Sequence, residues 1–199
     1  MATARLFLAL DPTAELQLRL ADCTRTLGPA FGDVRWVRAE ATHLTLLFLG
    51  DTAAERHEAL TTAVSAAVRE QPPVPCTVQG IGVFPDRRRP QVVWAGVTAG
   101  SEALGRLAAR LRNHVREAGF EVEDRPFAAH VTLGRLRPRA QSPRPAALHD
   151  ALDHWAETDL GRLAGDRVTL YESTLTPAGP RYHALHVWSL TTATTPEEQ

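Results

Sequence analysis

The sequence contains the tetrapeptide His43-Leu44-Thr45-Leu46 and a near copy of it, His130-Val131-Thr132-Leu133. In an extended strand successive side chains point to opposite faces. The histidine and the threonine of each copy therefore share one face, and the two aliphatic residues share the other. Two such strands facing one cleft would place an imidazole and a hydroxyl on each side of a bound phosphate.

These residue types suit the cleavage of a phosphodiester without a metal ion. A base must deprotonate the attacking water and an acid must protonate the leaving oxygen. Histidine, with an unperturbed pKa of ~6.5, can do either near neutral pH. In-line displacement puts the attacking and leaving oxygens on opposite sides of phosphorus, so the acid and the base should face each other across it. The hydroxyls of Thr45 and Thr132 would then donate to the non-bridging oxygens.

Other interpretations of the two histidines are weaker. One His-x-Thr match is more simply explained by a half-buried histidine in a strand, but a second copy at the corresponding place favours a shared function. A metal site would need spacings such as His-x-His or His-Glu-x-x-His, or a carboxylate on the motif face, and neither copy has them. We therefore expect no metal ion and no other cofactor.

The composition excludes several classes of function. The chain has 199 residues, enough for one domain with a substantial core, and 44% of them are hydrophobic. A net charge of −1 argues against broad, charge-driven binding to duplex nucleic acid. All 22 basic residues are arginine, so a mechanism with a lysine nucleophile is excluded.

The sequence shows no targeting segment. No apolar run approaches the ~18–20 residues of a membrane span, and no secretory signal precedes the first strand-like segment. We therefore expect a cytoplasmic monomer with no membrane contact. Cys23 and Cys76 lack the spacing of metal ligands. We interpret them as free thiols in a reducing compartment, with a disulfide as the open alternative.

Hydrophobic periodicity and turn residues predict a mixed chain of helices and strands. We expect helices at 13–27, 53–70, 101–118 and within 143–155. Strands are expected at 5–10, 34–37, 43–49, 76–84, 91–97, 120–123, 168–175 and 182–190, and the second His-x-Thr strand starts at 130. The polar tail at 191–199 is expected to be disordered.

This order of elements repeats along the chain. The halves 5–84 and 91–175 each run strand, helix, strand, His-x-Thr strand, helix, strand, which indicates a duplication within one bilobal domain of residues 1–199. Duplicated units commonly pack with pseudo-twofold symmetry. We therefore predict an α+β fold with two mainly antiparallel sheets facing a central cleft and the helices outside.

Further segments accompany the two motifs: Arg5-Leu6-Phe7, Phe48-Leu49-Gly50, Gly82 with Phe84-Pro85, Arg89-Pro90, Trp94, Arg125-Pro126-Phe127, Gly134-Arg135, Leu170–Ser173, and Gly179 with Tyr182. In this combination the chain resembles the RNA 2′,3′-cyclic phosphodiesterases, historically called 2′-5′ RNA ligases, of the two-histidine (2H) phosphoesterase superfamily. The resemblance covers most of the chain. Its most specific part is the paired motif, with Arg-Pro-Phe ahead of the second copy.

The resemblance implies metal-free hydrolysis of a terminal 2′,3′-cyclic phosphate on RNA to a 2′-phosphate, in a cleft between two lobes. By the same resemblance His43 is the general acid toward the 3′ oxygen, His130 is the general base for water, and Arg135 contacts phosphate. Strand alternation places Arg135 on the face opposite His130, so it reaches the phosphate only if the strand bends or ends there. The chain departs from the family at Ala129, where proline is common, and at Gly134, where alanine is frequent.

The substrate contacts beyond the phosphate are less specific in sequence. Single-stranded RNA ends are usually held by stacking on aromatic or arginine side chains. Phe84, Phe127 and Trp36 are candidates for this role, whereas the strand parity of Phe48 predicts a core position. The arginines at 87–89, Arg89 among them, would either guide the RNA backbone or lie in a solvated turn.

Two further hypotheses use the same motifs. One is an ATP-independent 2′-5′ RNA ligase, which would run the reaction backwards at the same site and join a cyclic end to a 5′-hydroxyl. The other is a non-catalytic nucleotide- or RNA-binding module, in which the motifs only hold phosphate. Turnover of a 2′,3′-cyclic nucleotide would indicate hydrolysis, joined oligomers would indicate ligation, and binding alone would indicate the module.

Because the motifs lack a ligand set, we expect activity on a 2′,3′-cyclic nucleotide to survive exhaustive EDTA treatment and dialysis. The measurement is the initial rate before and after chelation. A loss of activity that Zn²⁺ or Mn²⁺ restores would contradict the two-histidine mechanism and indicate a metal site.

Overall fold

A computed structural model of the chain describes residues 3–31, 33–137, 145–176 and 179–192. Its helices are α1 (Ala14–Phe31), α2 (His57–Val68), α3 (Ser101–Glu117) and α4 (Pro145–His154), with short 3-10 helices at Ala39–Ala41 and Ala54–Arg56. Its strands are β1 (Thr3–Leu10), β2 (Val34–Trp36), β3 (Leu44–Ala53), β4 (Cys76–Phe84), β5 (Val92–Val97), β6 (His130–Leu136), β7 (Asp159–Leu163), β8 (Arg167–Thr176) and β9 (Gly179–Ser189). The predicted α+β class is confirmed.

The strands of the described residues form one curled antiparallel sheet. Its order is β7-β4-β5-β6-β3-β1-β8-β9, and β2 pairs with β6. The two His-x-Thr strands, β3 and β6, meet at the centre, where Leu44 pairs with Val131. The two expected antiparallel sheets are therefore the halves of one continuous sheet, joined at this pair.

Counted from this junction, the strand order is symmetric. On each side come the His-x-Thr strand, then the first strand of the same half of the sequence (β1 or β5), then the last strand of the other half (β8 or β4). The two halves of the sequence thus exchange a strand. The duplication itself stays a prediction, which this symmetry favours.

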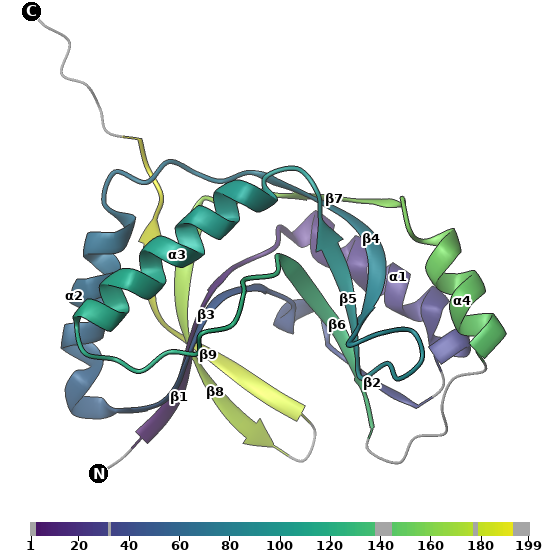
Figure 1. Ribbon diagram of the computed structural model, residues 1–199, viewed down its shortest axis with the longest axis horizontal. Helices are drawn as coiled ribbons and strands as arrows, with labels where there is room; N and C mark the ends of the chain where they lie inside the picture. The colour runs from purple at the N-terminus through teal and green to yellow at the C-terminus, as the bar shows by residue number, and fades with distance from the viewer. Residues whose placement is uncertain (1–2, 32, 138–144, 177–178, 193–199) are drawn as a thin grey trace, which may run out of the picture.

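The helices lie in two pairs at opposite ends of the molecule (Figure 1). α1 packs against α4 and β7, whereas α2 packs against α3, which also contacts β3. Leu20 of α1 and Leu107 of α3 are almost completely buried. Full burial of one such side chain contributes about 1.5–3 kcal/mol. Each helix pair therefore stabilises one half of the sheet.

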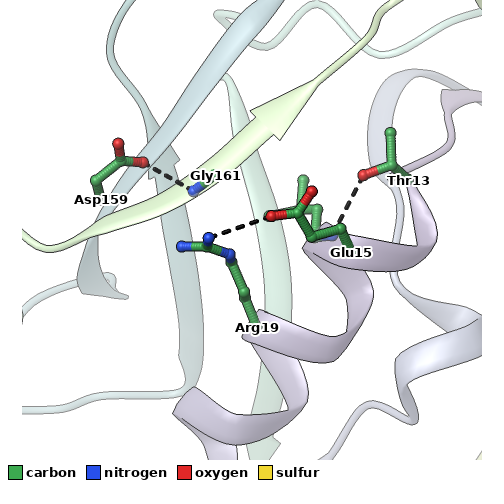
Figure 2. Close-up of polar contacts among 6 residues, drawn as sticks. Thr13, Glu15, Arg19, Asp159 and Gly161 are labelled. Atoms are coloured by element: carbon green, nitrogen blue, oxygen red, sulfur yellow. Dashed lines mark hydrogen bonds and ion pairs between the residues drawn. The ribbon is translucent and has the colours of Figure 1, made fainter.

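Local polar contacts set the start of α1 beside β7 (Figure 2). The Thr13 hydroxyl accepts a hydrogen bond from the Leu16 amide at 3.2 Å, which caps the helix. Glu15 and Arg19, one turn apart, form an exposed ion pair at 3.2 Å. The Gly161 amide of β7 donates to the Asp159 carboxylate at 2.8 Å. Gly161 has a φ of +120°, which favours glycine at this position of the strand.

Three elements differ from the sequence-based expectation. α1 does not end at residue 27 but continues to Phe31, because the buried Phe31 ring packs edge-on against Trp36 with centroids 6.0 Å apart. Residues 120–123 form no strand; Phe120 is buried, and the Arg56 guanidinium lies 3.9 Å from its ring centroid. β7, which pairs with β4, has no counterpart among the predicted strands.

The remaining general expectations have mixed outcomes. Cys23 and Cys76 are free and buried, as expected, and burial raises the pKa of their thiols to about 12 and about 11. None of the helices in the described part of the chain is long and apolar enough to cross a membrane. Most of the tail predicted to be disordered, residues 193–199, lies outside the described residues.

The glycine at position 134 has a structural reason. A Cβ at this position would lie 2.6 Å from Cγ1 of Val34 and 2.8 Å from Cε3 of Trp36. Both residues belong to β2, which pairs with β6 here. The glycine therefore lets β2 and its tryptophan approach the second motif strand.

Replacing Gly134 with alanine should destabilise the fold by about 1–3 kcal/mol, the usual cost of overpacking a close contact. Urea unfolding followed by tryptophan fluorescence would measure it. The matched control is Gly105→Ala in α3, where the nearest atom to a Cβ is 4.0 Å away on Phe127. That variant should gain about 0.5–1 kcal/mol. Equal stability of the two variants would show that β2 can move at no cost.

Candidate active site

Both motif histidines are held by the same backbone contact. Nδ1 of His43 lies 3.0 Å from the carbonyl oxygen of Ala41, and Nδ1 of His130 lies 2.7 Å from that of Ala128. Because a carbonyl oxygen can only accept, Nδ1 carries the proton in each ring and donates it. Nε2 is therefore the nitrogen of each imidazole that remains for proton transfer.

The junction of β3 and β6 places each histidine beside the threonine of the other motif. The registered pair Leu44–Val131, continued by one residue in each direction, brings His43 opposite Thr132 and Thr45 opposite His130. Side chains at opposed positions share a face, with Cβ atoms typically ~4.5–5.5 Å apart. All four motif side chains line one cavity.

A β-bulge follows each motif at the same position. Leu46 has no partner where β3 pairs with β1, and Leu133 has none where β6 pairs with β5. An extra residue in one strand shifts the alternation of its side chains by one. Arg135 and Phe48, which occupy corresponding places after the two bulges, therefore turn to the motif face and line the cavity.

The bulges decide two sequence-based expectations. Arg135 reaches the cavity of His130 although simple alternation places it on the opposite face; the bend that this position requires is present. The core position predicted for Phe48 is wrong, because its side chain is 51% exposed at the cavity.

Aromatic rings pack against both imidazoles. The His43 ring lies 4.8 Å from that of Phe7 and meets Tyr182 edge-on at 4.9 Å, measured between centroids. The His130 ring meets Phe84 edge-on at 5.2 Å. These contacts restrict the rotation of the imidazoles and remove them from water. Burial is accordingly the main cause that lowers the pKa of both histidines below the ordinary value, and the charge of Arg135 lowers both further.

The two histidines differ in their charged neighbours. The carboxylate of Asp11 raises the pKa of His43 and partly opposes the effect of burial. It is held by two hydrogen bonds, from the Tyr171 hydroxyl at 2.8 Å and the Thr169 hydroxyl at 2.7 Å. No carboxylate acts on the pKa of His130 in the described residues. A carboxylate therefore favours the protonated form at His43 alone, against burial and the charges of His130 and Arg135, which lower the pKa of His43.

The cavity measures about 420 Å³ and its lining is positive. The strand pair β8–β9 contributes one wall, which includes Ser173, Leu175 and Tyr182. Among the described residues, no aspartate or glutamate lines this cavity, and four arginines do: Arg5, Arg35, Arg38 and Arg135. Imidazoles, hydroxyls and guanidinium groups without carboxylates form a site suited to a phosphate.

The structure therefore brings together His43, Thr45, His130, Thr132 and Arg135, but not all the residues suggested by sequence. Phe84 contacts His130 without lining the cavity, and Phe127 packs partly buried against the core. Arg89 lies in the turn between β4 and β5, where its amide donates to Asp86 at 3.0 Å. Of the candidates for stacking, Trp36 does line the cavity.

Sequence reasoning missed several lining residues: Arg5, Arg35, Arg38 and Tyr182. Arg5 and Tyr182 belong to the segments that carry the family resemblance, which was their only signal. Arg35 and Arg38 carry none, because arginine is the sole basic residue throughout the chain. In the described part of the chain no three His, Cys, Asp or Glu side chains gather as metal ligands would.

Comparison with known proteins gives consistent matches. The family model described as the 2′-5′ RNA ligase superfamily matches residues 11–176. An RNA 2′,3′-cyclic phosphodiesterase of Thermotoga maritima is 31% identical, over 92% of this chain and 93% of that protein. The protein of the same name from Escherichia coli is 32% identical, over 94% of this chain and 97% of that protein.

A solved structure of E. coli LigT complexed with 3′-AMP superposes with a TM-score of 0.74 at 30% identity, covering 96% of this chain and all of that one. The matched residues 11–176 include both motif histidines, both bulges and Arg135. A match of this extent, with such relatives along nearly the whole length, makes this chain a member of the 2′-5′ RNA ligase superfamily.

Proposed function

We propose that the protein hydrolyses 2′,3′-cyclic phosphate ends of RNA to 2′-phosphates, as a metal-independent phosphoric diester hydrolase. The observation that carries the proposal is the matched pair of imidazoles in one cavity, each with Nδ1 bound to a backbone carbonyl and Nε2 left for proton transfer. The relatives named RNA 2′,3′-cyclic phosphodiesterase support the choice of substrate. We place the reaction in the cytoplasm, with RNA ends or cyclic nucleotides as partners and the enzyme as a monomer.

The reaction needs one proton taken and one given. Nε2 of His130 accepts a proton from water as the water oxygen bonds to phosphorus. The bond from phosphorus to the 3′ oxygen breaks, and Nε2 of His43 donates its proton to that oxygen. The products are a 2′-phosphate and a 3′-hydroxyl, and the two histidines return to their starting protonation states by exchange with solvent.

The assignment of acid and base rests on the surroundings of the two rings. Asp11 favours the protonated imidazole at His43, which is the form that a general acid needs. Burial and Arg135 favour the neutral ring at both histidines, but at His130 no carboxylate of the described residues opposes them, and the neutral ring is the form that a general base needs. A bound anionic phosphate favours protonation and so helps His43 to hold its proton until the transition state.

Other lining residues take supporting roles in this proposal. The hydroxyls of Thr45 and Thr132 donate to the non-bridging oxygens, and Arg135 neutralises the charge that develops there. Phe48, exposed at the cavity, offers a ring for stacking the terminal base. Phe84 supports His130 rather than the base, given its edge-on contact with that ring.

Separate replacement of the two histidines should reveal their roles. On a dinucleotide with a 2′,3′-cyclic end, His43→Ala and His130→Ala should each lose ~10²–10⁴-fold in kcat/KM. A p-nitrophenyl phosphodiester has a leaving group that needs little protonation. On that substrate His43→Ala should recover most of its relative activity, whereas His130→Ala stays impaired because water must still be deprotonated.

The product isomer is measured in the same experiment by chromatography against 2′- and 3′-phosphate standards. A 3′-phosphate product would show that the bond from phosphorus to the 2′ oxygen breaks instead. Joined oligomers would favour ligation. Equal losses in both variants on both substrates would show that the histidines bind phosphate without transferring protons.

Asp11→Asn should move the alkaline limb of the pH profile of kcat/KM to lower pH. The reason is that the carboxylate raises the pKa of His43, so its removal lets the acid lose its proton at lower pH. The acidic limb, which reports the base His130, should stay in place. Initial rates on the cyclic dinucleotide between pH 4 and 9 would measure both limbs.

The matched control is Tyr171→Phe, which removes one hydrogen bond to Asp11 but keeps its charge. Its alkaline limb should not move to lower pH. The p-nitrophenyl substrate gives a second control, since Asp11→Asn should leave its rate almost unaffected. A shift of the acidic limb in Asp11→Asn would instead associate Asp11 with the base.

A further inference from the structure

The cavity carries more positive charge than the proposed reaction needs. A cyclic phosphodiester has one negative charge, whereas four arginines and no described acidic residue line the cavity. One of these arginines is paired with a carboxylate: Arg38 forms an ion pair with Glu40 at 3.3 Å. Arg5, Arg35 and Arg135 form no ion pair with a described carboxylate. Of these three, Arg35 and Arg135 lie side by side on paired strands.

These two arginines are direct cross-strand partners. In the antiparallel pairing of β2 with β6, Arg35 lies opposite Arg135. Like charges at directly opposed positions are destabilising, and opposed Cβ atoms are only ~4.5–5.5 Å apart. Neither arginine forms an ion pair with a carboxylate of the described residues. Asp33, which precedes β2, forms an ion pair with Arg137 at 3.2 Å.

Packing holds this pair of charges in place. The Trp36–Gly134 pair is adjacent to Arg35–Arg135, and the close approach at Gly134 keeps β2 against β6. The bulge at Leu133 turns Arg135 into the cavity, and its partner Arg35 lines the same cavity. Two arginines at opposed positions of paired strands, both lining one cavity, offer separate positive groups to an anionic ligand.

We propose that Arg35 binds a second phosphate of the substrate, attached to the 5′ oxygen of the nucleoside whose 2′ and 3′ oxygens carry the cyclic phosphate. This inference rests on the proposed function. With the cyclic phosphate on Arg135, the 5′ oxygen is the one other position of the terminal ribose that can carry phosphate. Adjacent arginines on neighbouring strands would then take adjacent phosphates, each through the bidentate contact that guanidinium favours.

The second phosphate could come from either of two kinds of substrate. One is the internucleotide phosphate of a longer RNA, and the other is a 5′-phosphate on a cyclic mononucleotide. Three substrates separate them: a 2′,3′-cyclic mononucleotide with a free 5′-hydroxyl, the same molecule with a 5′-phosphate, and a dinucleotide with a cyclic end. The readout is the ratio of kcat/KM with the 5′ phosphate to kcat/KM without it.

For the native enzyme we expect a ratio of ~10 for at least one of the two phosphorylated substrates, the size of a single charge-assisted contact. The ratio should fall with ionic strength. In Arg35→Ala it should fall to about 1, and in Arg35→Lys to an intermediate value, because lysine keeps the charge but loses the bidentate fork. The matched controls are Arg38→Ala, at an arginine paired with Glu40, and Arg5→Ala, at a lining arginine of β1 that does not lie opposite Arg135. Both should keep most of the native ratio.

Several outcomes would overturn the inference. A native ratio near 1 for both phosphorylated substrates would show that no second phosphate is bound. A dinucleotide advantage that persists in Arg35→Ala would assign the preference to stacking of the second base. Loss of the ratio in Arg5→Ala but not in Arg35→Ala would move the site to β1. Failure of the native enzyme to hydrolyse any of the three substrates would instead contradict the proposed function.

Discussion

The site depends on one short stretch of pairing between β3 and β6. These strands meet at the centre of the sheet through the pair Leu44–Val131, whose side chains are both completely buried. Burial of this pair fixes the register, and the register decides that His43 lies opposite Thr132 and His130 opposite Thr45. A slip of either strand by one residue would turn its histidine and threonine away from the cavity. The chemistry of the motifs thus follows from an apolar contact behind them.

The same junction explains how two nearly identical motifs come to differ. Each motif ends in a bulge, and the side chain two residues later points into the cavity. That side chain is Phe48 after the first motif and Arg135 after the second. Asp11 then adds a negative charge beside His43 only. The first motif is therefore accompanied by the Phe48 ring and the Asp11 carboxylate, and the second by the Arg135 guanidinium. A symmetric arrangement of backbone therefore supports an asymmetric reaction, with distinct places for the acid and the base.

The sequence predicts the motif faces well and their surroundings poorly, for physical reasons. His43 and His130 are recognisable because a period of two residues governs any strand. Phe48 is not, since a bulge arises from pairing with another strand and breaks that period without a local signal. Similarly, α1 passes the Gly28-Pro29 stop because Phe31 gains a buried place against Trp36, a tertiary contact that outweighs local preference. Arg35 is visible only as a cross-strand partner.

The exchange of strands between the two halves makes the site a property of the whole chain. His130, in the second half, packs on Phe84 from the first, and His43, in the first half, packs on Tyr182 near the end of the chain. Each histidine is therefore covered in part by residues from outside its own half. Contacts so distant in sequence carry an entropic cost of loop closure that burial must offset. The burial that lowers the pKa of both imidazoles therefore depends on residues from both parts of the chain.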